Sequence, residues 1–226
     1  MSQVFVSWSG GKDCCLAAYR ATVSGLGVRY LANTVTGDGQ RSRSHGLLAE
    51  VLQVQSQAIG IPLAQRRISE GGYEGAFKSL LRGFKAEGIN GGVFGDIDFN
   101  EPRLWIDRVC QEEEITPYYP LWEEDQDKIM RNFIDLGFEA VVVATKADLL
   151  GEEWLGRKVD LDFIKELENL EETKKITLCG EAGEYHTLVT DGPLFKKRIE
   201  VMEANTILKS EHWFLNIARS QLRDKR

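Results

Sequence analysis

The sequence predicts an α/β protein with a doubly wound parallel sheet, Rossmann-like in architecture, followed by a smaller C-terminal α/β domain. Over the first half of the 226 residues, short apolar runs alternate with amphipathic segments of helical period, a pattern that implies right-handed βαβ units. Polar or glycine-rich turns also follow three of the apolar runs, at positions that meet at the carboxyl edge of such a sheet. Ligands of this fold bind at that edge.

The expected helices and strands follow from the hydrophobic periodicity and from the glycines and prolines that end each segment. Gly25, Gly60 and Gly88 each end an amphipathic segment, and Pro120 marks a boundary between an apolar run and a new helical pattern. We therefore expect two domains, residues 1–122 and 123–226. The first should contain strands at 4–8, 28–36, 62–68, 92–95 and 116–121 and helices at 13–25, 45–59, 73–87 and 103–114. The second should contain helices at 125–136 and 160–172, strands at 140–144 and 176–179, an antiparallel pair over 196–218 that reverses around Ala204 and Asn205, and a solvated tail at 223–226.

The first predicted strand runs directly into Ser9, Gly10, Gly11, Lys12 and Asp13 at the start of a helical pattern. Consecutive glycines at a helix N-terminus let an anion approach backbone N–H groups, and a lysine adds a mobile positive charge. The loop lacks the first glycine of a Walker A motif. The alternative to an anion site is a purely structural tight turn. Asp13 either caps the helix or lies near Mg²⁺.

A second group of polar residues follows the strand expected at 176–179. Glu181 and Glu184 flank Gly183, and His186 and Thr187 come just beyond. Carboxylates and an imidazole on a glycine-containing turn can orient an amine-bearing substrate or bind a metal, whereas the structural alternative is an exposed acidic turn.

The loop at Ser9–Asp13 resembles the pyrophosphate loop (PP-loop) of the N-type ATP pyrophosphatases, whose fold is adenine nucleotide α-hydrolase-like. Further motifs come in the order seen in the diphthine-ammonia ligase family: Gly95-Asp96-Ile97 with Arg103, Pro120-Leu121-Trp122, Trp154-Leu155-Gly156-Arg157, and the segments at 180–189 and 191–195. The resemblance implies a PP-loop ATP-binding domain followed by a substrate-recognition domain. It assigns ATP binding to Ser9, Gly10, Gly11, Lys12, Asp13, Gly95, Asp96 and Arg103, catalysis to Lys12 and Asp13, Mg²⁺ to Asp13, and substrate binding to Glu181, Gly183, Glu184, His186 and Thr187.

Three residues depart from the family pattern. Cys14 replaces a Ser or Thr, and Ala182 and His186 stand where the motif Glu-Gly-Gly-Glu-x-Glu has a glycine and its last glutamate. An imidazole titrates near neutrality, and its protonated form would oppose the quaternary ammonium of diphthine.

The resemblance implies an ATP-dependent ligase that adenylates a substrate carboxylate and transfers free ammonia, as in diphthamide biosynthesis. The acceptor is either diphthine on elongation factor 2 or a small carboxylate. The alternatives are a PP-loop pyrophosphatase with another substrate, a tRNA sulfur transferase using Cys14, Cys15 or Cys179, and a non-catalytic ATP-binding sensor.

Composition limits these alternatives. The net charge of −7 argues against a nucleic-acid partner. The absence of a long apolar run or leader predicts a cytoplasmic protein without membrane contact. Four unpatterned cysteines fit a reducing compartment. A homodimer is compatible with all of these features.

Overall fold

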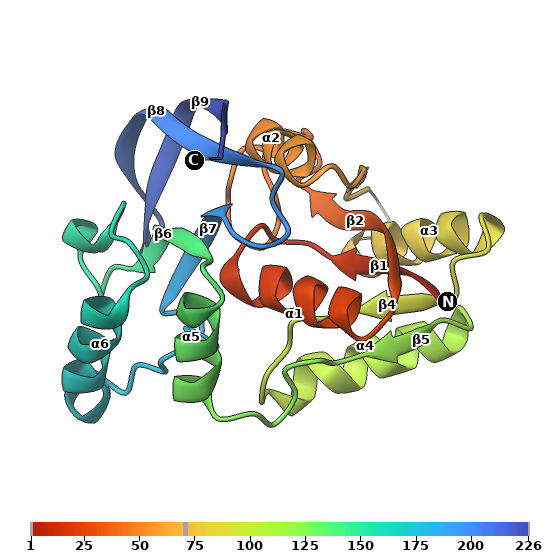
Figure 1. The fold of residues 1–226 in the computed structure, drawn as a ribbon, viewed down its shortest axis with the longest axis horizontal. Helices are drawn as coiled ribbons and strands as arrows, with labels where there is room; N and C mark the ends of the chain where they lie inside the picture. Colours follow the sequence, from red (N-terminus) through yellow and green to blue (C-terminus); the bar gives the residue numbers. More distant parts are fainter. Residues whose placement is uncertain (1, 70–71, 226) are drawn as a thin grey trace.

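The computed structural model describes residues 2–69 and 72–225, which fold around two sheets that follow one another along the chain (Figure 1). The first sheet is parallel, with the strand order β3-β2-β1-β4-β5, and the second is antiparallel, with the order β7-β6-β9-β8. The strands are β1 (Gln3–Ser7), β2 (Gly27–Val35), β3 (Leu63–Arg67), β4 (Gly91–Val93), β5 (Thr116–Tyr118), β6 (Glu139–Lys146), β7 (Tyr185–Asp191), β8 (Lys197–Lys209) and β9 (His212–Asp224). The helices are α1 (Lys12–Val23), α2 (Ala49–Ile59), α3 (Gly72–Ala86), α4 (Asn100–Glu112), α5 (Gln126–Asp135), α6 (Leu161–Lys174) and the 3-10 helix η1 (Glu152–Trp154).

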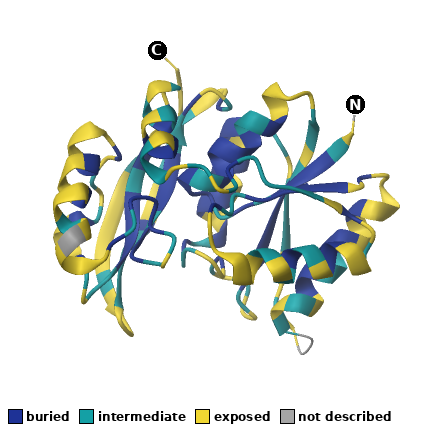
Figure 2. Ribbon diagram, turned by 90° about the horizontal axis from the view of Figure 1, so that it is seen from below, coloured by how far each residue is buried: buried dark blue, intermediate teal, exposed yellow. Residues whose placement is uncertain are grey.

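The parallel sheet is covered by helices on both faces, as the sequence predicts for a doubly wound fold. Neighbouring side chains of β1 point to opposite faces: Val4 and Val6 pack in the core with α1 and α2, whereas Phe5 packs with α3 and α4. Both faces of the strand are therefore buried, as Figure 2 shows for the centre of the sheet. This explains why β1 is a continuous apolar run and not an alternating one.

The two sheets share one hydrophobic core on the face that carries α1 and α2. The segment between them is held by Arg20, which donates to the carbonyl oxygen of Pro120 (3.1 Å) and to Oδ1 of Asn132 (2.9 Å) and pairs with Glu124. The boundary at residue 122 lies in this segment and stays a prediction. No helix in the described ranges 2–69 and 72–225 is long and apolar enough to cross a membrane.

The expected strand at 176–179 is wrong. The backbone N–H of Thr177 donates to the carboxylate of Glu184 (2.6 Å), and that of Cys179 donates to the side chain of Gln126 (2.8 Å). Side chains thus take the bonds that a neighbouring strand would need, and the segment is a loop that leads into β7.

The C-terminal hairpin is longer than expected. Ala204 and Asn205 lie within β8, opposite Ile217 and Asn216, and the chain reverses at Ser210, which has a φ of 55°. Residues 223–225 of the expected tail are also not free, because β9 continues through Asp224 and the ammonium of Lys225 pairs with Asp191 (2.9 Å). Arg226 lies outside the described residues.

Helix α2 begins at Ala49 and not at 45. Gly46 has a φ of 66°, which ends any helical path there, and the preceding residues form a loop that folds back onto the end of β2, where Ser42 forms a bridge with Val35. This loop, residues 36–48, forms part of the candidate site.

Candidate active site

A cavity of about 410 Å³ opens at the carboxyl ends of β1 and β4, where the sequence predicts a ligand site. We call it the loop cavity, because the turn between β1 and α1 forms one of its walls. Its lining includes Ser9, Asp13, His45, Gly95, Asp96 and Glu181. Both predicted groups of polar residues, from the two ends of the chain, therefore contribute to a single cavity.

Two glycines are required by the geometry of this wall. Gly10 has a φ of 83°, and a Cβ at this position would lie 2.5 Å from the side chain of Leu52. A Cβ on Gly95 would lie 2.9 Å from the backbone of Asp13 and Cys14 at the N-terminus of α1. The turn after β4 and the start of α1 can approach this closely only because Gly95 has no side chain.

The turn between β1 and α1 is fixed by strand β7 of the second sheet. The backbone N–H of Val189 donates to the carbonyl oxygen of Gly10 (3.0 Å). The buried amide of Gln55 donates to the same carbonyl (3.0 Å) and to that of Val189 (2.8 Å), and it accepts from Nε1 of Trp8 (2.8 Å). We call Trp8, Gln55, Gly10 and Val189 the glutamine clamp. Gln55 is not predicted from the sequence, because its only signal there is a polar residue on an apolar helix face.

Lys12 joins the two parts of the chain. Its backbone N–H donates to Oγ1 of Thr187 (3.0 Å), and its buried ammonium donates to both carboxylate oxygens of Asp13 (2.9 Å each) and to the carbonyl oxygen of Cys179. Burial lowers the pKa of Lys12, but the surrounding charges, that of the Asp13 carboxylate first among them, together outweigh burial and raise that pKa. Lys12 is therefore a permanent cation. Thr187 contacts the loop itself.

Four carboxylates line the loop cavity, namely Asp13, Asp96, Glu101 and Glu181. Burial raises the pKa of Asp96 to about 6 and that of Glu181 to about 8, and the charge of Asp13 adds to both shifts. Such mutual repulsion favours a bound cation, and carboxylate oxygens are the ligands that Mg²⁺ prefers. Within the described residues no group of three possible ligands is close enough to hold a metal ion by itself. Asp13 and Asp96 thus suit Mg²⁺ if phosphate oxygens supply further ligands, as is usual for this ion.

His186 forms a stacked pair with His45, with ring centroids 4.4 Å apart and an angle of 20° between the rings. His45 comes from the loop before α2, and its Nδ1 lies 3.2 Å from the carbonyl oxygen of Thr187. Burial lowers the pKa of His186 to about 4, with the positive charge of Lys12 adding to the shift, and burial also places the pKa of His45 well below its usual value. Both imidazoles are uncharged at neutral pH. The sequence predicts that His45 begins a helix, and it gives no sign of a role for His45 in the site.

Eight predicted site residues are not among those that line the cavity: Gly10, Gly11, Lys12, Arg103, Gly183, Glu184, His186 and Thr187. Three of them have structural roles of their own. Glu184 is buried, and its carboxylate accepts the backbone N–H of Thr177. Gly183 forms a left-handed turn, with a φ of 83°. The guanidinium of Arg103 lies 4.1 Å from the ring centroid of Trp122. These residues shape the surroundings of the cavity.

The departures from the expected loop pattern have local explanations. The thiol of Cys14 donates to the carbonyl oxygen of Gly11 (3.2 Å), so it closes the loop internally. Ala182 has no positive φ, and its methyl group therefore causes no backbone strain. Burial raises the pKa of the Cys179 thiol, which keeps it protonated, and Cys14, Cys15, Cys110 and Cys179 are all buried.

Comparison with known proteins finds two family models. One, described as the diphthamide synthase N-terminal domain, matches residues 2–117, and the other, described as the diphthamide synthase C-terminal domain, matches residues 125–222. A diphthine–ammonia ligase from Danio rerio is 27% identical over 227 residues, which cover 91% of this chain and 89% of the relative. One from Rattus norvegicus is 28% identical over 236 residues, covering 95% and 88%. A solved structure from Methanocaldococcus jannaschii, described as a predicted subunit of tRNA methyltransferase, aligns with a TM-score of 0.48 and 14% identity over 85% of this chain and 98% of its own, which is too distant to bear on function.

Proposed function

The chain belongs to the diphthine-ammonia ligase family, and from this premise we propose that it is an ATP-dependent ligase that adenylates a carboxylate of its acceptor and then transfers ammonia to it. One observation carries the proposal. The anion-binding turn at the start of α1 and the acidic residue Glu181 of the second unit line the same cavity, with the Lys12 ammonium bonded to both units.

The nucleotide phosphates would lie at the N-terminus of α1. Aligned peptide dipoles favour an anion at this end of a helix, and the Lys12 ammonium lies at the same end. When phosphate arrives, the ammonium can exchange part of its contact with Asp13 for the new anion. Mg²⁺ held by Asp13 and Asp96 would neutralise charge on the leaving pyrophosphate.

The reaction has two displacement steps. A carboxylate oxygen of the acceptor attacks the α-phosphorus, and the bond from that phosphorus to pyrophosphate breaks. Ammonia then attacks the activated carbonyl carbon, the bond to the AMP oxygen breaks, and the nitrogen gives up a proton. Glu181 lines the cavity, and its carboxylate form can hold ammonium close by and accept that proton. Because the pKa of Glu181 is raised to about 8, the share of this form grows as pH rises through that value. Lys12 stabilises the charge that develops on pyrophosphate.

The acceptor remains the open part of the proposal. His186 is neutral, so it does not repel the quaternary ammonium of diphthine, but it also lacks the counter-charge that a glutamate would supply. Diphthine on elongation factor 2 and a small carboxylate both fit this chemistry. The sulfur-transferase alternative is weakened because Cys14, Cys15 and Cys179 are all buried.

The test is a product assay with purified protein, ATP, Mg²⁺, ammonium and elongation factor 2 that carries diphthine. AMP, pyrophosphate and a mass change equal to amidation of the factor would support the whole proposal. If AMP and pyrophosphate form only when a metabolite extract is added, the result would support the adenylation step but reject diphthine as the acceptor. ATP binding without turnover in either condition would indicate the sensing module instead.

A further inference from the structure

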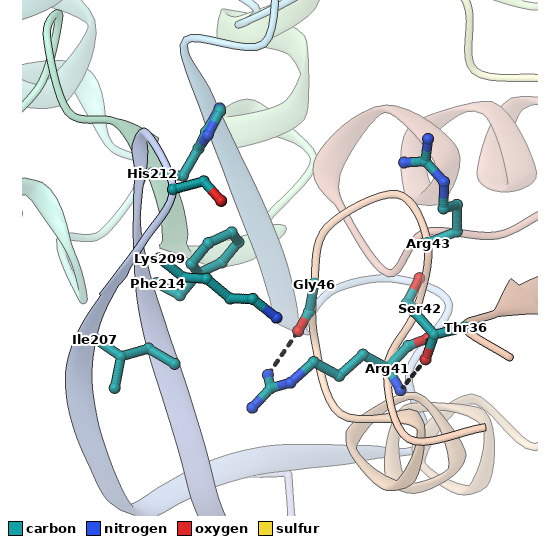
Figure 3. A pocket seen from close by; sticks show the side chains of 10 residues that line it. Thr36, Arg41, Ser42, Arg43, Gly46, Ile207, Lys209, His212 and Phe214 are labelled. Atoms are coloured by element: carbon teal, nitrogen blue, oxygen red, sulfur yellow. Dashed lines mark hydrogen bonds between the residues drawn. The ribbon is translucent and has the colours of Figure 1, made fainter. Parts of the chain in front are cut away.

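A second cavity, of about 310 Å³, lies between the loop before α2 and the β8–β9 hairpin (Figure 3). We call it the hairpin cavity. Neither of the predicted groups of site residues contributes to it. Its lining includes Arg41, Arg43, Ile207, Lys209, His212 and Phe214.

The charge of this cavity is one-sided. Two arginines, a lysine and a histidine line it together with the hydroxyl groups of Thr36, Ser42 and Ser210, and no carboxylate is among the described lining residues. The whole chain has a net charge of −7, so a cavity whose described charged residues are all basic runs against the overall composition. Such a cluster is costly unless an anion occupies it, because like charges repel one another.

One of these cations is held in place before any ligand binds. The guanidinium of Arg41 donates to the carbonyl oxygen of Gly46 (2.8 Å) and to Oδ1 of Asn216 (2.8 Å), the first of which is drawn in Figure 3. The Lys209 side chain extends toward Arg41 in Figure 3 and has no ion pair with any residue that the structure describes, whereas the guanidinium of Arg43 points away from Arg41. A fixed guanidinium beside one unpaired ammonium is an arrangement that can bind a carboxylate or phosphate group.

The cavity also has an apolar wall. The ring of Phe214 lies so close to Gly46 that a Cβ there would be 2.8 Å from Cε1, and Ile207 lies on the neighbouring strand. The φ of 66° at Gly46 reinforces the need for glycine at this point. The ligand can therefore contact an aromatic face while its anionic group meets the cations.

The two cavities share a wall. Ser42, Arg43 and Gly46 line the hairpin cavity, whereas Ser44 and His45 line the loop cavity. A molecule in the hairpin cavity is thus separated from the proposed nucleotide site by a single turn of the chain.

We infer that the hairpin cavity binds the carboxylate or phosphate group of a second molecule, distinct from ATP, which carries an apolar group beside its anion. The inference rests on the proposed function only where it identifies that molecule with the acceptor. A cationic head group is excluded from this cavity by the same charges.

The experiment compares two ring compounds of opposite charge, phenyl phosphate and phenyltrimethylammonium, by isothermal titration calorimetry with the full chain. We expect phenyl phosphate to bind and the cation not to bind. Lys209→Gln should weaken the binding of phenyl phosphate about tenfold, the loss expected for one charge-assisted contact, and Arg43→Gln should weaken it less, because the Arg43 guanidinium points away from Arg41. Arg219→Gln is the matched control, since it removes an exposed charge from β9 outside the lining, and should leave the affinity unchanged.

A Lys12→Ala variant distinguishes the two cavities. Binding that persists in this variant supports the hairpin cavity, whereas binding that is lost there and unaffected by Lys209→Gln would place the anion on the PP-loop and overturn the inference. Absence of binding, or equal binding of the cation, would also overturn it. If the chain binds phenyl phosphate through Lys209 but never converts ATP to AMP, the hairpin cavity stands and the proposed ligase reaction fails. Where turnover occurs, competition between phenyl phosphate and the acceptor identifies the anion as part of the acceptor, and binding without competition identifies a free anion.

Discussion

Replacing Lys12 by alanine tests the central assignment of the loop cavity. The variant removes an ammonium that donates to Asp13 and to the carbonyl oxygen of Cys179. We expect pyrophosphate release from ATP to slow sharply, because none of the described residues that line the cavity is a lysine or an arginine, and Lys12 supplies the positive charge at the start of α1. Affinity for AMP should change less than the rate.

The magnitude follows from what a single positioned charge contributes in a transition state. Loss of one such donor raises a barrier by about 2 to 4 kcal/mol, which corresponds to a rate loss of roughly 30-fold to 1,000-fold. Folding should suffer less. The Asp13 side chain is 24% exposed, so water can replace the lost contact there, and the buried carbonyl of Cys179 is the main group left unpaired. The free energy of unfolding should fall by about 1 to 3 kcal/mol.

The assay is the release of AMP and pyrophosphate at saturating ATP, together with urea unfolding of the same preparation. Lys128→Ala removes an exposed lysine from α5 and is the matched control, with no expected change in rate. An unchanged rate in Lys12→Ala would refute the role of the loop in the reaction. A rate loss explained entirely by unfolded protein would refute the electrostatic argument.

Three further predictions concern the walls of the loop cavity. Gln55→Leu leaves buried partners unpaired and should lower the free energy of unfolding by about 3 to 5 kcal/mol in urea titration. Gln53→Leu, on the exposed face of α2, should change it little. Equal effects of the two variants would refute the stabilising role of the glutamine clamp. Gly95→Ala should displace the start of α1 and reduce AMP formation, whereas Gly83→Ala, where a Cβ meets nothing, should raise stability by about 0.5 to 1 kcal/mol. The pKa of Glu181 is raised from 4.5 to about 8, so the folded chain holds more protons than the unfolded chain in that interval and stability should fall as pH rises through it. Glu181→Gln should flatten this slope in urea titrations at several pH values, and an unaltered slope would show that Glu181 is not the group responsible.

The parallel sheet and its ligand edge could be predicted because they follow from local patterns. A buried strand that ends in glycine, and amphipathic helices ended by glycine, are visible within short windows of sequence. The placement of Gly95 and Asp96 beside the PP-loop then follows from topology alone. The structure confirms this convergence.

The contacts between distant segments could not be predicted in this way. Gln55 bonds to Gly10 and to Val189, which is 134 positions away, and nothing in the sequence near Gln55 indicates either partner. Glu184 shows the opposite case, a residue that the sequence predicts to bind substrate but that has a structural role. A carboxylate beside a glycine turn is typical of a binding residue, but residue type does not give the direction of the side chain, and this one bonds to the backbone of its own loop.

Strand β7 lies at an edge of the antiparallel sheet, and at Val189 its outer side is bonded to Gly10 and Gln55. An edge strand normally carries a liability, because its unpaired backbone groups can recruit another chain. The PP-loop here protects that edge, and the edge in return shapes the PP-loop. A fragment that contained only the second sheet would expose β7 and tend to aggregate, so the turn proposed to bind ATP also acts as a solubility cap for the other half of the protein.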